Sequence, residues 1–75
     1  MSYSLVGEKT GRTTHRQVYW VTPASMPGPF KCWSIKIVDS VLRGPKAGAV
    51  REKHKTCHSL QEAQKHIQTR LRHVP

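Results

Sequence analysis

The stretch Lys31–Val38, KCWSIKIV, decides how the rest of the chain is interpreted. Side chains alternate between the two faces of a β-strand, so Trp33, Ile35 and Ile37 share one face and smaller or polar residues share the other. The first face is bulky and apolar, and we expect it to be buried. A small sheet can bury one face against a helix and leave the other in solvent. The stretch therefore predicts the central strand of a small sheet with one covered face.

A second strand is predicted over residues 17–22, QVYWVT, which have high β-propensity. Both of its faces are apolar or aromatic, so either Tyr19 or Trp20 should lie on the open side of the sheet. The segment 23–29 holds three prolines and a glycine and predicts a stiff loop. We expect it to join this strand to the central one.

A third strand is predicted over residues 50–57, after an irregular connection over 39–48. Arg51, Lys53 and Lys55 alternate with other residues along it, and burying three unpaired cations would cost too much. We therefore expect them on the open face or at the sheet edge. Lysines on an edge strand also block pairing with other sheets, which is a structural explanation for the same pattern.

The segment SLQE, Ser59–Glu62, is a capping box that predicts the start of a helix. In this motif the Ser59 hydroxyl accepts from the backbone N–H of Glu62, and the Glu62 carboxylate accepts from the N–H of Ser59. The helix should run over 60–72, with a narrow apolar stripe of Leu60, Ala63, Ile67 and Leu71. The fold class is therefore α+β, a three-stranded antiparallel sheet packed on one C-terminal helix.

The chain has 75 residues, which predicts a single domain with a thin core and no deep enzyme cleft. Residues 1–16 show no period and carry several basic side chains, so we expect a flexible basic N-terminal arm. Residues 17–75 form the predicted β-β-β-α domain. Nothing in the sequence specifies an oligomer, and a monomer or a weak dimer through a sheet edge is expected.

Thirteen Lys and Arg oppose four Asp and Glu, giving a formal net charge of +9. Such a chain attracts polyanions, of which nucleic acid is the commonest, an acidic protein surface the next and a membrane the last. No apolar run approaches a membrane span, and the N-terminus does not resemble a secretory signal. We therefore expect a cytoplasmic protein with two free thiols, Cys32 and Cys57, and no membrane partner.

Metal binding and catalysis are not indicated. His54 and Cys57 are separated by two residues, but no second ligand pair accompanies them. There is no phosphate-cradling glycine loop and no pair of carboxylates for acid–base work. The prediction is a protein that is not an enzyme and needs no cofactor.

The predicted site is a basic surface for nucleic acid, with duplex DNA favoured over RNA. Cations on phosphates supply salt-sensitive affinity, and a β-sheet can enter the major groove. The candidate contacts come from the arm, the sheet and the 39–48 connection: Arg12, Arg16, Lys36, Arg43, Lys46, Arg51, Lys53 and Lys55. Lys36 and the three basic residues of the third strand are expected on one open face, beside Tyr19 or Trp20.

The order of WSIKI, a loop, a basic strand and CHSLQEA resembles the small AP2-like, arm-binding N-terminal domains of phage tyrosine recombinases. Those domains join strand to helix with aromatic-x-Thr-x-x-Glu-Ala, where this chain has Cys57, Ser59, Glu62 and Ala63. The resemblance, over Val18 to Leu71, implies a sheet laid in the DNA major groove by Lys36, Arg51, Lys53 and Lys55. It also suggests an accessory factor of a phage or mobile element, which would act at the nucleoid or in the host cytoplasm.

The alternative function is a protein–protein module, such as a phage-encoded, anti-CRISPR-like inhibitor of a host defence complex. It would dock on an acidic or nucleic-acid-binding surface of its partner. Its anchors would be the apolar residues of the proline loop, Met26, Pro27, Pro29 and Phe30.

Overall fold

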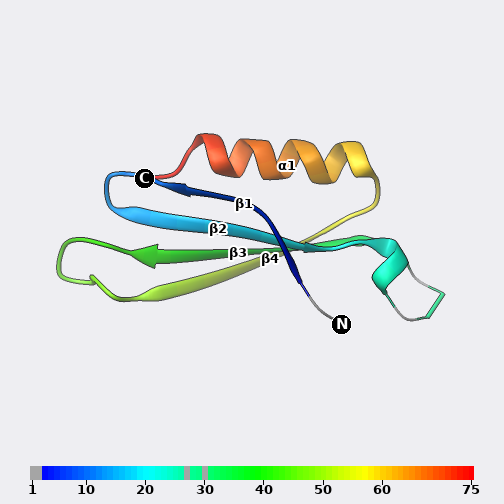
Figure 1. The fold of residues 1–75 in the computed structure, drawn as a ribbon, viewed down its shortest axis with the longest axis horizontal. Helices are drawn as coiled ribbons and strands as arrows, with labels where there is room; N and C mark the ends of the chain where they lie inside the picture. Colours follow the sequence, from blue (N-terminus) through cyan, green and yellow to red (C-terminus); the bar gives the residue numbers. More distant parts are fainter. Residues whose placement is uncertain (1–2, 27, 30) are drawn as a thin grey trace.

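The computed structural model of the chain describes residues 3–26, 28–29 and 31–75. They form an α+β fold in which one antiparallel sheet of four strands, in the order β1-β2-β3-β4, is covered on one face by a helix (Figure 1). The elements are β1 (Ser4–Thr10), β2 (Thr14–Val21), the short 3₁₀-helix η1 (Pro23–Ser25), β3 (Trp33–Val41), β4 (Val50–Cys57) and α1 (Leu60–Arg72). The α+β class and the C-terminal helix are confirmed, and the expected strand count of three is corrected to four.

The additional strand comes from the expected arm. Residues 4–10 pair with β2 as the edge strand β1, and residues 14–16 begin β2 itself. The pairing register shifts between Leu5 and Gly7, so the side-chain alternation that reveals a strand is interrupted there. At Gly7 an added Cβ would lie 2.5 Å from Cδ1 of Leu71, so glycine leaves room there for the Leu71 side chain.

The core lies between the sheet and α1. Ile35 of β3 and Val18 of β2 are fully buried, together with Ala63 of the helix. Ile37, Cys57 and Ile67 complete the buried cluster, and Val6, Trp20, Trp33 and Leu71 pack around it. The predicted covered face of β3 is therefore confirmed, with Trp33 at its half-buried border. Leu60, the first residue of the predicted stripe, is 44% exposed and lies outside the core.

The start of α1 follows its sequence signature in part. The Ser59 hydroxyl accepts from the backbone N–H of Glu62 at 3.1 Å, as predicted. The Glu62 carboxylate accepts from the N–H of His58 at 3.2 Å, one residue before the expected donor. The first interaction satisfies a backbone donor of the first helical turn, and the second ties the residue before the N-cap to the helix.

A buried ion pair joins β2, β3 and the end of α1. Arg16 donates to both carboxylate oxygens of Asp39, at 2.7 and 2.9 Å. Its remaining terminal nitrogen donates to the backbone carbonyl of Arg70 at 2.8 Å. Hydrogen bonding to Asp39 raises the pKa of Arg16, against the opposing effect of burial. Arg16 thus fixes the C-terminal half of the helix over the sheet.

One helix is too narrow to cover four strands. The axes of the outer strands are about 14 Å apart at normal strand spacing, and side chains extend the sheet beyond them. A helix with its side chains is about 10 Å across. The helix contacts all four strands, but a groove remains along each of its flanks, one beside β4 and one beside β1 and β2.

Candidate nucleic-acid interface

The basic residues of β4 lie on the helix side of the sheet. Antiparallel partners point to the same face, and Lys55 and Lys53 pair with the buried Ile35 and Ile37. Arg51 lies opposite Asp39 in the strand register and so points to the same side. The prediction that these three cations share an open face with Lys36 is therefore wrong, because Lys36 pairs with His54 on the opposite face. Their charges stay in solvent because α1 does not reach over this edge.

These lysines form one wall of a groove between β4 and α1. We call it the basic groove and define it by its lining residues, Ile37, Lys53, His54, Lys55, His66 and Arg70, around a volume of about 380 Å³. His66 and Arg70, one helical turn apart, supply the opposite wall. The groove thus has basic or ionisable groups on both of its walls, with Ile37 as its one apolar lining residue.

The charges of the basic groove are not neutralised within the protein. Among the described residues, Arg16 is the only Lys or Arg in an ion pair. Two of the four acidic residues, Glu8 and Glu52, lie on the open face beside histidines. Asp39 is held by Arg16, and Glu62 caps the start of α1. A phosphate entering the groove would therefore meet cations that have no other partner.

The open face of the sheet is not a basic surface. Lys36 is the only Lys or Arg among its strand residues, and its ammonium lies 4.5 Å from the ring centroid of Tyr3 and 5.0 Å from that of Tyr19. The same face carries the pairs His15–Glu8 and His54–Glu52. Tyr19 lies here and Trp20 on the helix side, which confirms that one of the two aromatic residues is on the open side.

The other predicted contacts are dispersed. Arg12 is exposed in the β1–β2 turn, and Arg43 and Lys46 are exposed in the loop that leads into β4. Arg16, predicted as a contact, is 7% exposed and committed to Asp39, so it is corrected to a structural residue.

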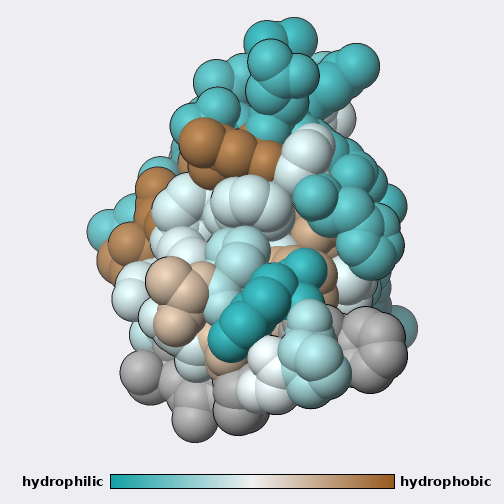
Figure 2. Space-filling view, turned by 90° about the vertical axis from the view of Figure 1, so that its right-hand side faces the viewer, coloured by the Kyte–Doolittle hydropathy of each residue, from teal (hydrophilic) through white to brown (hydrophobic). Residues whose placement is uncertain are grey.

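The proposed protein-interface anchors lie in the proline loop. Met26 is half-buried and Pro29 is exposed, whereas Pro27 and Phe30 lie outside the described residues. Figure 2 views this end of the molecule, and its coloured surface shows small apolar areas separated by hydrophilic side chains. The interface at this loop stays a prediction.

Two residues of the basic groove, His66 and Arg70, were not predicted as contacts. Their separation of four residues places them on one flank of α1, next to the Ala63–Ile67 stripe. That spacing was readable in the sequence. The sequence could not show which strand this flank of α1 faces, because the facing strand depends on how the helix lies across the sheet.

His66 titrates in an unusual environment. Burial is the main cause that lowers its pKa, and Arg70 and Lys55 lower it further, against a smaller opposing effect of Glu62. A lowered pKa in the folded state means that stability is full above the ordinary value of about 6.5 and is lost as the pH falls through the lowered value. A bound phosphate would raise the pKa of His66 instead, because its negative charge favours the imidazolium.

We therefore expect affinity for nucleic acid to rise on acidification from pH 7.5 to 6 at constant salt. The gain should be up to about tenfold for each unit by which a bound phosphate raises the pKa of His66. Fluorescence anisotropy with a labelled duplex measures it. His66→Gln should flatten the pH profile, while His15→Gln, on the open face, should leave it unchanged. Equal profiles for wild type and His66→Gln would show that no phosphate lies beside His66.

Other chemistries find little support in the described residues. Burial raises the pKa of Cys57, the opposite of what a reactive cysteine needs. No group of three or more potential metal ligands occurs in the described part of the chain. Within that part, no helix is long and apolar enough to cross a membrane.

Comparisons with known protein families, curated proteins and solved structures gave no match. The resemblance to AP2-like domains stays a prediction, as does the link to phages or mobile elements. The fold and the site define a small α+β domain with a basic groove beside its helix.

Proposed function

We propose that this chain is a nucleic-acid-binding protein that holds the phosphate backbone of duplex DNA in and along the basic groove. The observation that carries the proposal is the row of Arg51, Lys53 and Lys55 on one face of β4, opposite His66 and Arg70 of α1. Backbone contacts of this kind supply affinity without reading sequence.

The dimensions of the row suit a regular backbone. Residues on one face of a strand are about 6.7 Å apart, so the row extends over about 13 Å. Arg43 and Lys46 lie beyond its end in the β3–β4 loop, on a molecule 44 Å in its longest dimension. A duplex presents a phosphate of each strand about every 3.4 Å along its axis, so several lie within reach of the row. Cations fixed on a strand match such a repeating target.

A purely structural role for the same cations is the competing explanation. Inward-pointing charges on an edge strand prevent sheets from pairing edge to edge, and β4 is such an edge. Charges of either sign on β4 would serve that role. It would not need basic residues on α1. His66 and Arg70 across the groove are what favour an anion site.

Fluorescence anisotropy of the protein with a labelled 16-base-pair duplex tests the proposal. We expect binding at 50 mM salt that weakens linearly in the logarithm of salt concentration. With Arg51, Lys53, Lys55 and Arg70 each neutralising one phosphate, the slope should be about −3.6. A folded chain that shows no binding at 50 mM salt would refute the proposed function.

A further inference from the structure

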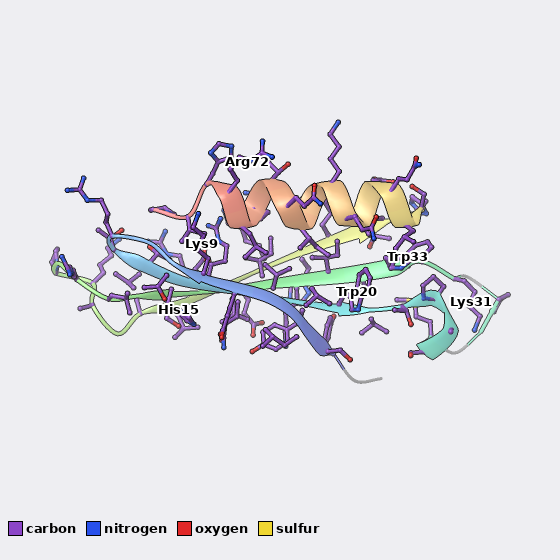
Figure 3. The ribbon with its side chains drawn as sticks, turned by 45° about the horizontal axis from the view of Figure 1, so that its top comes forward. Lys9, His15, Trp20, Lys31, Trp33 and Arg72 are labelled. Atoms are coloured by element: carbon purple, nitrogen blue, oxygen red, sulfur yellow. The ribbon has the colours of Figure 1, made fainter. Side chains whose placement is uncertain are left out.

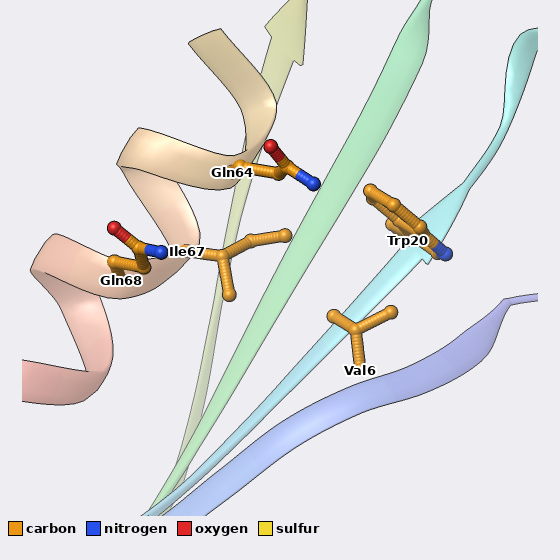
Figure 4. A pocket seen from close by; sticks show the side chains of 5 residues that line it. All are labelled: Val6, Trp20, Gln64, Ile67 and Gln68. Atoms are coloured by element: carbon orange, nitrogen blue, oxygen red, sulfur yellow. The ribbon is translucent and has the colours of Figure 1, made fainter. Parts of the chain in front are cut away.

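The second flank of α1 holds a pocket of different chemistry. It is lined by Val6, Trp20, Gln64, Ile67 and Gln68 and has a volume of about 420 Å³ (Figure 4). That volume lies within the ordinary range of sites for small ligands. We call it the aromatic pocket. It lies across the helix from the basic groove, where β1 and β2 extend beyond the cover of α1.

The walls of the aromatic pocket suit a flat ring with a polar edge. Trp20 offers a π surface, and Val6 and Ile67 offer aliphatic contacts. Gln64 and Gln68 add two primary amides, each of which can donate and accept hydrogen bonds. Figure 4 shows the Gln64 amide directed toward Trp20. Neither amide has a side-chain hydrogen-bond partner among the described residues.

Stacking on an aromatic side chain combined with amide bonds to a polar edge is how proteins hold unpaired nucleobases. A glutamine amide matches the donor and acceptor pair of adenine in particular. One cation lies on the same side of β1, toward the other end of the strand from Trp20. Lys9 of β1 pairs with Arg16 and so lies on the helix side, the flank to which the pocket belongs (Figure 3). The acidic residue next to it, Glu8, points to the open face and pairs with His15.

We propose that the aromatic pocket binds one unpaired nucleobase, adenine first among them. This inference deepens the proposed function and rests on it for the source of the base. The substrate would be a duplex that carries a bulged nucleotide, with the backbone of one strand in the basic groove and the base extruded from the other strand in the aromatic pocket across the helix, because one nucleotide cannot span a helix about 10 Å wide. The binding is non-covalent, and it adds selectivity for a structural feature of DNA to the salt-dependent affinity of the backbone contacts.

Three duplexes of one sequence test the proposal: a matched duplex, one with a single bulged adenine, and one with an abasic nucleotide in place of that adenine. The abasic form keeps the bend of a bulge and removes the base. We expect the adenine bulge to bind about tenfold more tightly than the abasic bulge, as one stacked base would give. Gln64→Ala/Gln68→Ala should reduce this preference, and Gln61→Ala, exposed on the same helix, should keep it.

A spectroscopic readout locates the base. Trp33→Phe leaves Trp20 as the only tryptophan, and its fluorescence should be quenched by the adenine bulge and not by the abasic one. If all three duplexes bind equally without quenching, the pocket assignment is wrong and the proposed function stands. If no duplex binds, the proposed function fails, and AMP against ribose 5-phosphate then decides the pocket. Quenching of Trp20 by AMP alone would support a nucleobase site, and no quenching would overturn it.

Discussion

Replacing Asp39 with alanine is expected to lower the free energy of unfolding by about 3–5 kcal/mol, the usual cost of removing one partner from a buried ion pair. The side chains of Arg16 and Asp39 are only 9% and 13% exposed, and their two hydrogen bonds are short. Without the carboxylate, a guanidinium remains between the sheet and α1 with only the Arg70 carbonyl as partner. Since the total free energy of unfolding of a domain is only about 5–15 kcal/mol, the variant should be close to unfolding.

Urea denaturation followed by far-UV circular dichroism measures this change as a shift in midpoint. The matched control is Arg16→Met/Asp39→Leu, which removes both charges and fills the space with apolar side chains. We expect the double variant to recover most of the loss, because apolar replacement of a buried pair is often neutral or stabilising. A loss below about 1 kcal/mol in Asp39→Ala would mean that the pair is solvated in solution.

The second large effect concerns binding. The double charge reversal Lys53→Glu/Lys55→Glu should weaken duplex binding at least about tenfold at 100 mM salt, because it turns two phosphate contacts into repulsions. The control is Lys31→Glu/Lys65→Glu, which changes the net charge equally at two exposed residues outside the basic groove. Anisotropy titrations at one salt concentration compare the two variants with the wild type.

This pair of variants also separates the two explanations for the lysines. Glutamate keeps an inward-pointing charge on the edge strand, so protection against edge pairing is retained and the variant should remain folded and monomeric. Size-exclusion chromatography checks that state. If binding falls equally in both double variants, the overall charge attracts DNA and the basic groove has no special part.

Patterns formed by residues close together in the sequence predicted the helix and the covered face of the central strand. The capping box at Ser59 and the apolar stripe over Ala63 and Ile67 predicted helix 60–72, and the structure has Leu60–Arg72. The alternation of Ile35 and Ile37 predicted the covered face of β3, and both are buried. In these cases neighbours in sequence create the pattern, so no knowledge of the fold is needed.

The wrong predictions concern features that depend on contacts between residues far apart in the sequence. The strand β1 escaped notice because its register shift at Val6 breaks the alternation, and only pairing with β2 reveals it. The sequence places Arg16 among the surface cations, because its partner, Asp39, is 23 residues away. Lys53 and Lys55 are expected on the open face or at the sheet edge; β4 is indeed an edge strand, but both lysines lie on the helix side. The helix is narrower than the sheet, so the helix side of β4 is itself exposed.

Whether the basic groove holds the DNA backbone is tested by the salt dependence of duplex binding, measured for the wild type and Lys53→Glu/Lys55→Glu side by side. Each phosphate contact adds nearly one to the magnitude of the slope of log affinity against log salt. We predict that the slope of the variant is smaller in magnitude by about two, while Lys31→Glu/Lys65→Glu keeps the wild-type slope. Identical slopes in the wild type and Lys53→Glu/Lys55→Glu would contradict the claim, because neither lysine would then contact a phosphate.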